Sequence, residues 1–213
     1  MGLFTINSKM RKSVNNQYKK IVNFTIPALV TKDGFKTCPN AGACAKGCYA
    51  RMGAYVWPKV YAKHLSNLEA TKHKAFTQLA ITELIKIKAN LVRIHDSGDF
   101  YSKDYVNKWL EVCKALPNIQ FYAYTKMISL FKSIDKLPNN LIIIYSYGGI
   151  EDNLIDPLHD RHSMVFETET ELKAWGYIDT SNDDTLALGI NPKIGLVYHG
   201  NKSFTNTNWG NVK

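Results

Sequence analysis

The sequence predicts one α/β domain over residues 1–213, built as an incomplete βα barrel of about six mostly parallel strands with helices on the outside. Three observations predict this class. Short apolar segments alternate with helical patterns, and the segments start at residues 91, 119, 141, 164 and 194, about one βα unit apart. No linker rich in Pro, Gly or Ser divides the chain. About six strands are too few for a complete barrel, which usually needs roughly 250 residues.

The first predicted elements flank a cysteine-rich loop. Residues 21–29 are an apolar stretch, interrupted by Pro27, that predicts a strand leading into this loop. After the loop, Pro58 suits the first turn of a helix, because no intrahelical bond to its nitrogen is needed there. The apolar residues that follow recur at helical spacing: Tyr61, Leu65, Leu68, Phe76, Leu79, Ala80, Leu84 and Ile87. We therefore expect a long helical region with one face in the core.

Strands and helices alternate over the rest of the chain. The predicted strands cover residues 91–95, 119–124, 141–145, 164–167 and 194–198, and the predicted helices cover residues 103–115, 128–134 and 169–175. Strands that alternate with helices in this way form parallel sheets. Their carboxyl ends are then expected to meet at one edge.

Composition and charge limit the classes of function. Hydrophobic residues make up 45% of the chain, and no apolar run approaches the roughly 18–20 residues of a membrane span. The first residues lack the apolar core of a signal peptide, so we expect a cytoplasmic protein without membrane contact. Residues 1–90 hold 15 Lys and Arg against 3 Asp and Glu. Such a basic half attracts nucleic acid or a phosphorylated substrate, or is simply a well-solvated lysine-rich surface.

Three cysteines, Cys38, Cys44 and Cys48, lie in a C-x5-C-x3-C spacing. Disulfides are not expected in a reducing cytoplasm, whereas thiolates suit iron–sulfur clusters or zinc. Structural zinc normally takes four ligands, and no fourth is evident nearby. Cys113 lies on the apolar face of a predicted helix and is expected in the core. The spacing favours a [4Fe-4S] cluster with one open iron, and a zinc site or unligated redox thiols are the alternatives.

Polar residues follow the predicted strands. Ser97, Gly98 and Asp99 form the turn after the strand at 91–95, where ligands of parallel sheets bind. Gly98 lets the backbone approach a ligand, and Asp99 can accept a hydrogen bond from an ammonium group. The alternative is that these residues only shape the turn. Four residues at later strand ends are candidate catalytic residues lining the same pocket: Tyr124, Lys126, Tyr145 and His199.

Four motifs carry a resemblance to a known family. CPNAGACAKGCYARMGAY, RIHDSGDFYSKDYVNKW, FYAYTK and IGLVYHG resemble the "gene 88 product" family of phage proteins, over residues 7–203. The resemblance implies a bacteriophage or prophage origin, and hence the cytoplasm of a bacterial host.

That family is in turn distantly similar to radical S-adenosylmethionine enzymes, in which three cysteines after the first barrel strand hold a [4Fe-4S] cluster. The similarity implies that Cys38, Cys44 and Cys48 are the cluster ligands. Ser97, Gly98 and Asp99 then contact the amino group of S-adenosylmethionine, together with Tyr49 as a further cofactor contact. The usual spacing is C-x3-C-x2-C with an aromatic residue before the third cysteine, whereas here Tyr49 follows it. The implied reaction is reductive cleavage of S-adenosylmethionine followed by hydrogen abstraction from a substrate.

A second class of function stays open. The chain could instead be a non-catalytic iron–sulfur or zinc protein that binds nucleic acid or a host factor through its basic residues 1–90.

Overall fold

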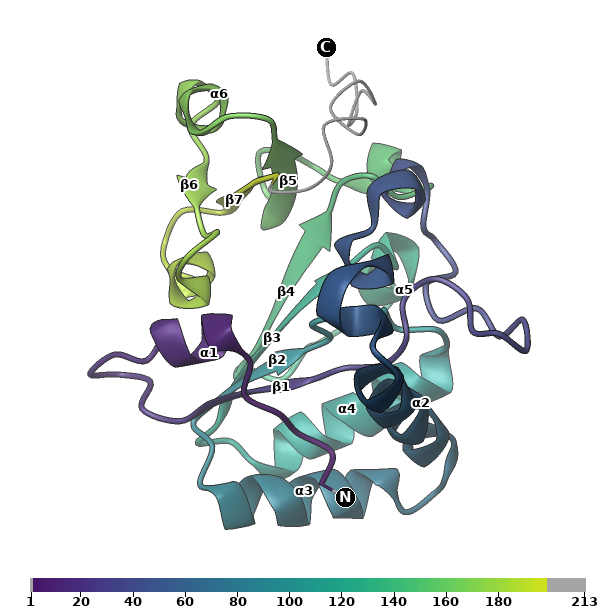
Figure 1. Ribbon diagram of the computed structural model, residues 1–213. Helices are drawn as coiled ribbons and strands as arrows, with labels where there is room; N and C mark the ends of the chain where they lie inside the picture. The colour runs from purple at the N-terminus through teal and green to yellow at the C-terminus, as the bar shows by residue number, and fades with distance from the viewer. Residues whose placement is uncertain (1, 199–213) are drawn as a thin grey trace.

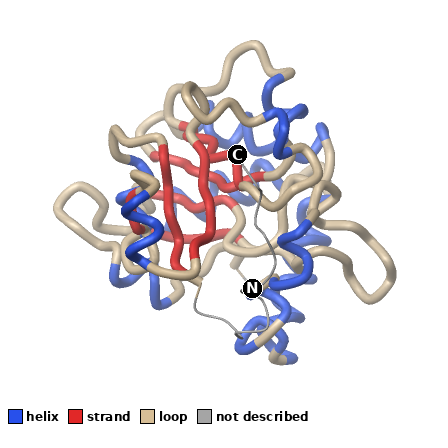
Figure 2. Tube along the Cα trace, turned by 90° about the horizontal axis from the view of Figure 1, so that it is seen from above, coloured by secondary structure: helices blue, strands red, loops and turns tan. Residues whose placement is uncertain are grey.

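The structure is a computed structural model that describes residues 2–198. Seven parallel strands form one sheet in the order β1-β2-β3-β4-β5-β7-β6 (Figure 1). Seen from above, the sheet curls and helices surround it (Figure 2). The predicted incomplete barrel of parallel strands with outer helices is therefore confirmed as a half barrel.

The predicted elements recur with small shifts at their ends. The strands are β1 (Ile21–Phe24), β2 (Leu91–Ile94), β3 (Gln120–Thr125), β4 (Leu141–Ser146), β5 (His162–Phe166), β6 (Ile178–Asp179) and β7 (Lys193–Val197). The α-helices are α1 (Ser8–Lys12), α2 (Pro58–Lys72), α3 (Phe76–Ile87), α4 (Lys103–Ala115), α5 (Ile128–Lys132) and α6 (Glu169–Ala174). Short 3-10 turns are η1 (Ala43–Gly47), η2 (Tyr49–Arg51), η3 (Gly53–Val56), η4 (Asp152–Leu154) and η5 (Asp184–Leu188). The sequence did not predict α1 or β6, because neither has an apolar repeat long enough to show a period.

The outer face of the sheet packs against helices through apolar side chains. Its strand residues are Val22, Phe24, Val92, Ile94, Phe121 and Ala123. Trp109 of α4 lies at the centre, with its ring centroid 5.1 Å from that of Phe24 and 5.4 Å from that of Phe76. Helices α3 and α4 lie side by side beneath the sheet (Figure 1). Leu79 was expected in this core but is 52% exposed, because α3 buries the row Phe76, Ala80 and Leu84 instead.

The inner face carries polar residues among its apolar ones. Asn23, Arg93 and Tyr122 are lateral neighbours on β1, β2 and β3. Below them, α1 and η5 close the inner face, since Met10 and Ala187 pack there against the strands. Access to the inner face is thus restricted on the side of α1 and η5, and the carboxyl ends of the strands form the other edge of the sheet.

Among residues 2–198, no helix combines the length and apolarity that crossing a membrane requires.

Candidate functional site

The cysteine segment, residues 38–57, lies against the loop that follows β4. The backbone N–H groups of Gly42 and Cys44 donate to the carbonyl oxygen of Gly148, at 3.1 and 3.0 Å. A Cβ atom at Gly42 would lie 2.8 Å from the backbone of Gly149. Only a glycine allows this close approach of two backbones, so Gly42 fixes how the segment sits on the sheet.

The three predicted ligands share one neighbourhood at this edge. Burial, together with the charges of Asp99 and Cys48, raises the pKa of the Cys38 thiol to about 12. Burial also raises the pKa of Cys48, and Cys44 acts in the same direction. Lys126 counteracts both shifts. The thiols are therefore close enough to interact electrostatically, and a cation stands beside them.

Each of the three cysteines is partly accessible. Cys38, Cys44 and Cys48 are half-buried free thiols, and the Cys38 Sγ accepts a hydrogen bond from the backbone N–H of Leu29 at 3.3 Å. Cys113 is buried in the core on α4, as its helical position predicted. Within the part of the chain that the structure describes, no three His, Cys, Asp or Glu side chains are arranged to hold one metal ion.

Asp99 links the ends of β2 and β3 to the cysteine segment. One carboxylate oxygen accepts from the Thr125 hydroxyl at 2.6 Å and from the Phe100 N–H at 2.7 Å, and the other accepts from the Lys126 N–H at 2.9 Å. The Asp99 N–H donates to the carbonyl of Thr37, next to Cys38, at 3.1 Å. Burial raises the pKa of Asp99 despite these bonds. The carboxylate therefore holds the edge together, and about one of its roughly four acceptor positions is left for a ligand.

Ser97 and Gly98 shape the same turn. The Ser97 hydroxyl donates to the carbonyl of Ile26 at 2.7 Å. Gly98 has φ +84°, and a Cβ atom there would lie 2.2 Å from the Ile26 side chain. Both residues thus pack the strand ends of β1 and β2 against each other.

The four candidate catalytic residues are not all brought together. Lys126 lies beside the cysteines, and its ammonium donates to the Ser146 hydroxyl at 2.8 Å. Tyr124 points to the inner face, where the Arg93 guanidinium lies 5.1 Å from its ring centroid. Tyr145 points to the outer face, packed against α5 with Lys132 over its ring at 5.7 Å. His199 lies outside the described residues.

Tyr49 connects the cysteine segment to the end of β2. Its hydroxyl donates to the carbonyl oxygen of Asp96, while its ring is half exposed next to Cys48. The Tyr55 hydroxyl donates to the Asp96 carboxylate at 2.7 Å, and the Asn7 amide donates to the same oxygen at 3.0 Å. These bonds hold the segment over the strand ends.

A buried ion cluster below this edge was missed by the sequence reasoning. The Asp184 carboxylate lies 2.8 Å from Arg93, 2.5 Å from Lys9 and 2.6 Å from the Tyr122 hydroxyl. Burial opposes ionisation, but Arg93 and Lys9 outweigh it and hold the pKa of Asp184 below its ordinary value. An arginine inside the apolar strand Leu91–Ile94 was the available signal, because a charge in a buried strand needs a partner.

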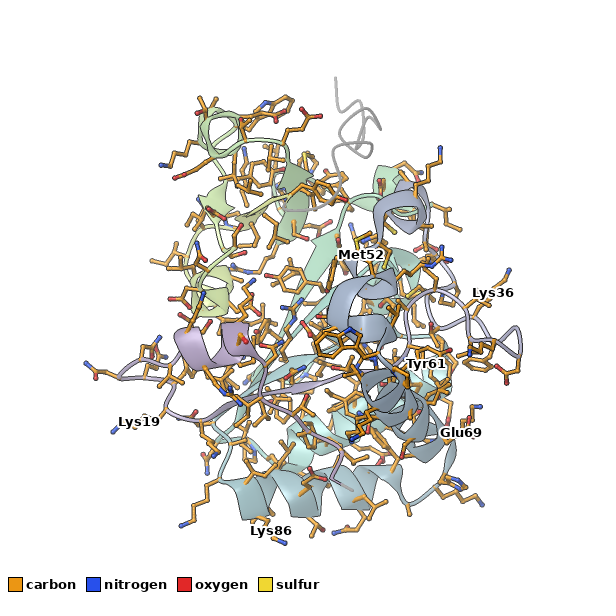
Figure 3. The ribbon with its side chains drawn as sticks, in the orientation of Figure 1. Lys19, Lys36, Met52, Tyr61, Glu69 and Lys86 are labelled. Carbon is orange, nitrogen blue, oxygen red and sulfur yellow. The ribbon has the colours of Figure 1, made fainter. Side chains whose placement is uncertain are left out.

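Three of the basic residues of the N-terminal half lie apart from one another. Lys19, Lys36 and Lys86 project from three separate edges of the molecule (Figure 3). This distribution favours the solvated lysine-rich surface over a single nucleic-acid groove.

Comparison with known proteins identifies a phage family. The family model described as Gene product 88 matches residues 1–207. The Gene 88 protein of Mycobacterium phage D29 is 33% identical over 126 residues, covering 52% of each chain. The Gene 88 protein of Mycobacterium phage L5 is 36% identical over 112 residues, covering 46% of each chain.

The chain aligns with about half the length of the curated relatives it matches. No solved structure matches it. The similarity to radical S-adenosylmethionine enzymes therefore stays a prediction, whereas the predicted phage family is confirmed. The chain belongs to the Gene product 88 family.

Proposed function

We propose that this protein binds a [4Fe-4S] cluster through Cys38, Cys44 and Cys48 and uses it in a reaction of the radical S-adenosylmethionine type. The observation that supports the proposal is the electrostatic coupling of Cys48 with Cys38 and with Cys44, next to Lys126, in a segment bonded to the loop after β4. Ligands of parallel α/β sheets bind at the carboxyl edge of the strands.

Sulfur donors suit iron–sulfur clusters and zinc alike, so the number of ligands is the argument for a cluster. Structural zinc normally takes four ligands, and the sequence offers no evident fourth near the three cysteines. A cubane cluster held by three cysteines leaves one iron open, so three donors are compatible with it.

The surrounding residues have defined tasks in this proposal. Lys126 offsets the negative charge of the thiolates, since its charge already lowers the pKa of Cys38 and Cys48. Asp99 has an acceptor position for the amino group of S-adenosylmethionine, and the Tyr49 ring lies beside Cys48 as a contact for the cofactor. When bound, a cluster with an open iron supplies the electron that cleaves S-adenosylmethionine. Met10 and Ala187 cover the inner face on the side of α1 and η5, which supports an approach of substrate from the strand-end edge, where the cysteines are half exposed.

Electron paramagnetic resonance of the anaerobically reduced protein tests the proposal. We expect a [4Fe-4S] signal that changes when S-adenosylmethionine is added, because the cofactor reaches an open iron. A cluster signal that does not change with S-adenosylmethionine would contradict the proposed reaction but would support the cluster. Bound zinc without any cluster signal would contradict both.

Single cysteine variants test the ligand assignment. Cys38→Ala, Cys44→Ala and Cys48→Ala should each abolish cluster retention, measured as iron content after anaerobic reconstitution. Cys113→Ala is the matched control, because Cys113 is buried on α4 away from the segment, and it should retain the cluster if it folds. Full occupancy in Cys44→Ala would contradict the assignment.

Nucleic-acid binding through residues 1–90 is the second candidate. Thirteen of their Lys and Arg side chains are exposed, and Lys72 with Glu69 is the one ion pair among these thirteen in the described range. This reading predicts binding to nucleic acid at low salt that weakens steeply as salt rises, through counterion release. Absence of binding at low salt would remove it.

A further inference from the structure

A small pocket opens between the cysteine segment and α2, separate from the cysteines. Its volume is about 210 Å³, and three stretches of chain line it: Pro27, Ala28, Val30, Ala50, Arg51, Tyr55, Val56, Tyr61 and His64. The space equals about seven waters at ~30 Å³ each. A single ring with one attached group fits such a volume.

His64 gives the pocket an unused polar group. The side chain is 8% exposed, and its ring packs against that of Tyr55 with the centroids 5.9 Å apart. Within residues 2–198, neither ring nitrogen has a hydrogen-bond partner. The ring nitrogens are not among the fully buried polar atoms that lack a partner, so a ligand in the pocket can reach them. The pocket is therefore expected to supply a partner for His64.

The charge around the pocket is positive. Arg51 is exposed and forms no ion pair within the described range, and no Asp or Glu lines the pocket. The Lys32 ammonium lies 5.9 Å from the ring centroid of Tyr61. Burial lowers the pKa of His64, with Asp96 opposing and Lys63 reinforcing this shift, so the ring is neutral and can donate one hydrogen bond and accept another.

We propose that this pocket binds a small organic anion, with its carboxylate or phosphate on Arg51 and His64 and its apolar body against Val30, Val56 and Tyr61. A guanidinium recognises both kinds of anion through paired hydrogen bonds. The apolar part of the lining selects a ligand with a compact apolar body over a bare inorganic ion. The site does not depend on the cluster, because none of the three cysteines lines it.

Isothermal titration calorimetry on the full chain tests the proposal with benzoate and phenyl phosphate as probes. We expect saturable binding of at least one of them, with a dissociation constant below about 10 mM. Benzamidine has the same ring with a positive charge and should not bind. Preference for benzoate or for phenyl phosphate identifies the anionic group. Equal affinity for inorganic phosphate would overturn the assignment of an apolar body.

Two variants locate the binding. Arg51→Gln should weaken binding roughly tenfold or more, the size expected when a charge-assisted hydrogen bond is lost. Because Arg51 is exposed, this change is expected to leave the fold intact. Lys46→Gln is the control, since Lys46 is an exposed cation of the same segment that does not line the pocket. Binding of neither probe, or equal binding by Arg51→Gln, would contradict the proposal. His64→Phe should weaken binding as well, if the variant folds.

Discussion

On its outer face the sheet presents Phe24, Ile94 and Phe121 to the helices, whereas on its inner face the neighbouring residues of the same strands are Asn23, Arg93 and Tyr122. Alternate residues of a strand point to opposite faces, so each of these strands places side chains both in the outer apolar core and on the inner polar face. The outer face is stabilised by apolar packing. The inner face depends on ionic and hydrogen-bonded partners that come from distant parts of the chain. The comparison predicts different responses to mutation and to pH.

The largest effect is expected on the outer face. Trp109 is 1% exposed and contacts Phe24 and Phe76, so Trp109→Ala leaves a cavity and should lower the free energy of unfolding by about 3–5 kcal/mol. Urea unfolding measures this loss. Leu79→Ala on α3 is the control and should change stability by no more than about 0.5 kcal/mol, because Leu79 is exposed. Equal losses would show that the helices do not pack as described.

Breaking the inner ion cluster should come next. Asp184→Asn removes the buried counter-ion of Lys9 and leaves Arg93 with Asp96 alone, at 3.4 Å, and should cost roughly 3 kcal/mol. Combining Asp184→Asn with Arg93→Met should cost less than the sum of the two single changes, since the two side chains interact directly. Glu169→Gln, at an exposed ion pair, should cause no measurable change. Strict additivity of the first two changes would contradict the cluster.

Gly42→Ala should disturb the contact between the cysteine segment and the loop that follows β4. A Cβ atom there would lie 2.8 Å from the backbone of Gly149, so the cysteine segment must shift. We expect a loss of about 1–3 kcal/mol, as for overpacking, together with lower iron retention. Gly189→Ala is the control, because its nearest contact would be 3.4 Å, close to ordinary van der Waals distance. Unchanged iron retention in Gly42→Ala would separate the docking of the segment from metal binding.

The effect that is smallest at neutral pH, and grows on acidification, is a pH dependence that belongs to the outer face. Burial lowers the pKa of His95 to about 3, and the charge of Arg93 acts in the same direction. An unfolded histidine titrates near 6.5, so between about pH 6.5 and 3 the unfolded chain binds a proton that the folded chain does not. Stability should therefore fall on acidification through this window, by up to about 1.4 kcal/mol per pH unit from His95.

This loss of stability is measured as the slope of the free energy of unfolding against pH. His95→Gln should flatten the slope between pH 6 and 4, and the lowered pKa values of His64 and His162 leave a residual slope of the same sign. His73→Gln, at an exposed histidine, should leave the slope as it is. An unchanged slope in His95→Gln would mean that His95 is not held neutral in the folded protein.

The sequence predicted what depends on local pattern. Ser102 caps α4 by accepting from the Tyr105 N–H at 3.2 Å, and the apolar runs of β2 and β3 mark buried strands. The shared site that the spacing of the three cysteines predicts stays a prediction. The hydrogen bond between Arg93 and Asp184 joins residues 91 positions apart, and no local pattern encodes such a pairing.

The face of the sheet to which a strand side chain points is a second feature that the sequence did not predict. Tyr124 and Tyr145 both stand at strand ends, but a shift of one residue in the strand turns a side chain to the opposite face. The structure accordingly places Tyr124 inside and Tyr145 outside. The bonds from Tyr49 and Tyr55 to Asp96 depend on how the cysteine segment folds back, which spacing alone does not predict.

If the three cysteines hold an iron–sulfur cluster, the anaerobically reconstituted chain must contain iron and acid-labile sulfide, and both can be measured. We expect equal amounts of iron and sulfide, about four of each per chain as the cluster formula requires, in the unchanged protein and in Cys113→Ala. Both should be lost in Cys38→Ala, Cys44→Ala and Cys48→Ala. Bound zinc without sulfide, or full iron and sulfide in any of these three variants, would contradict the assignment of the cluster to these cysteines.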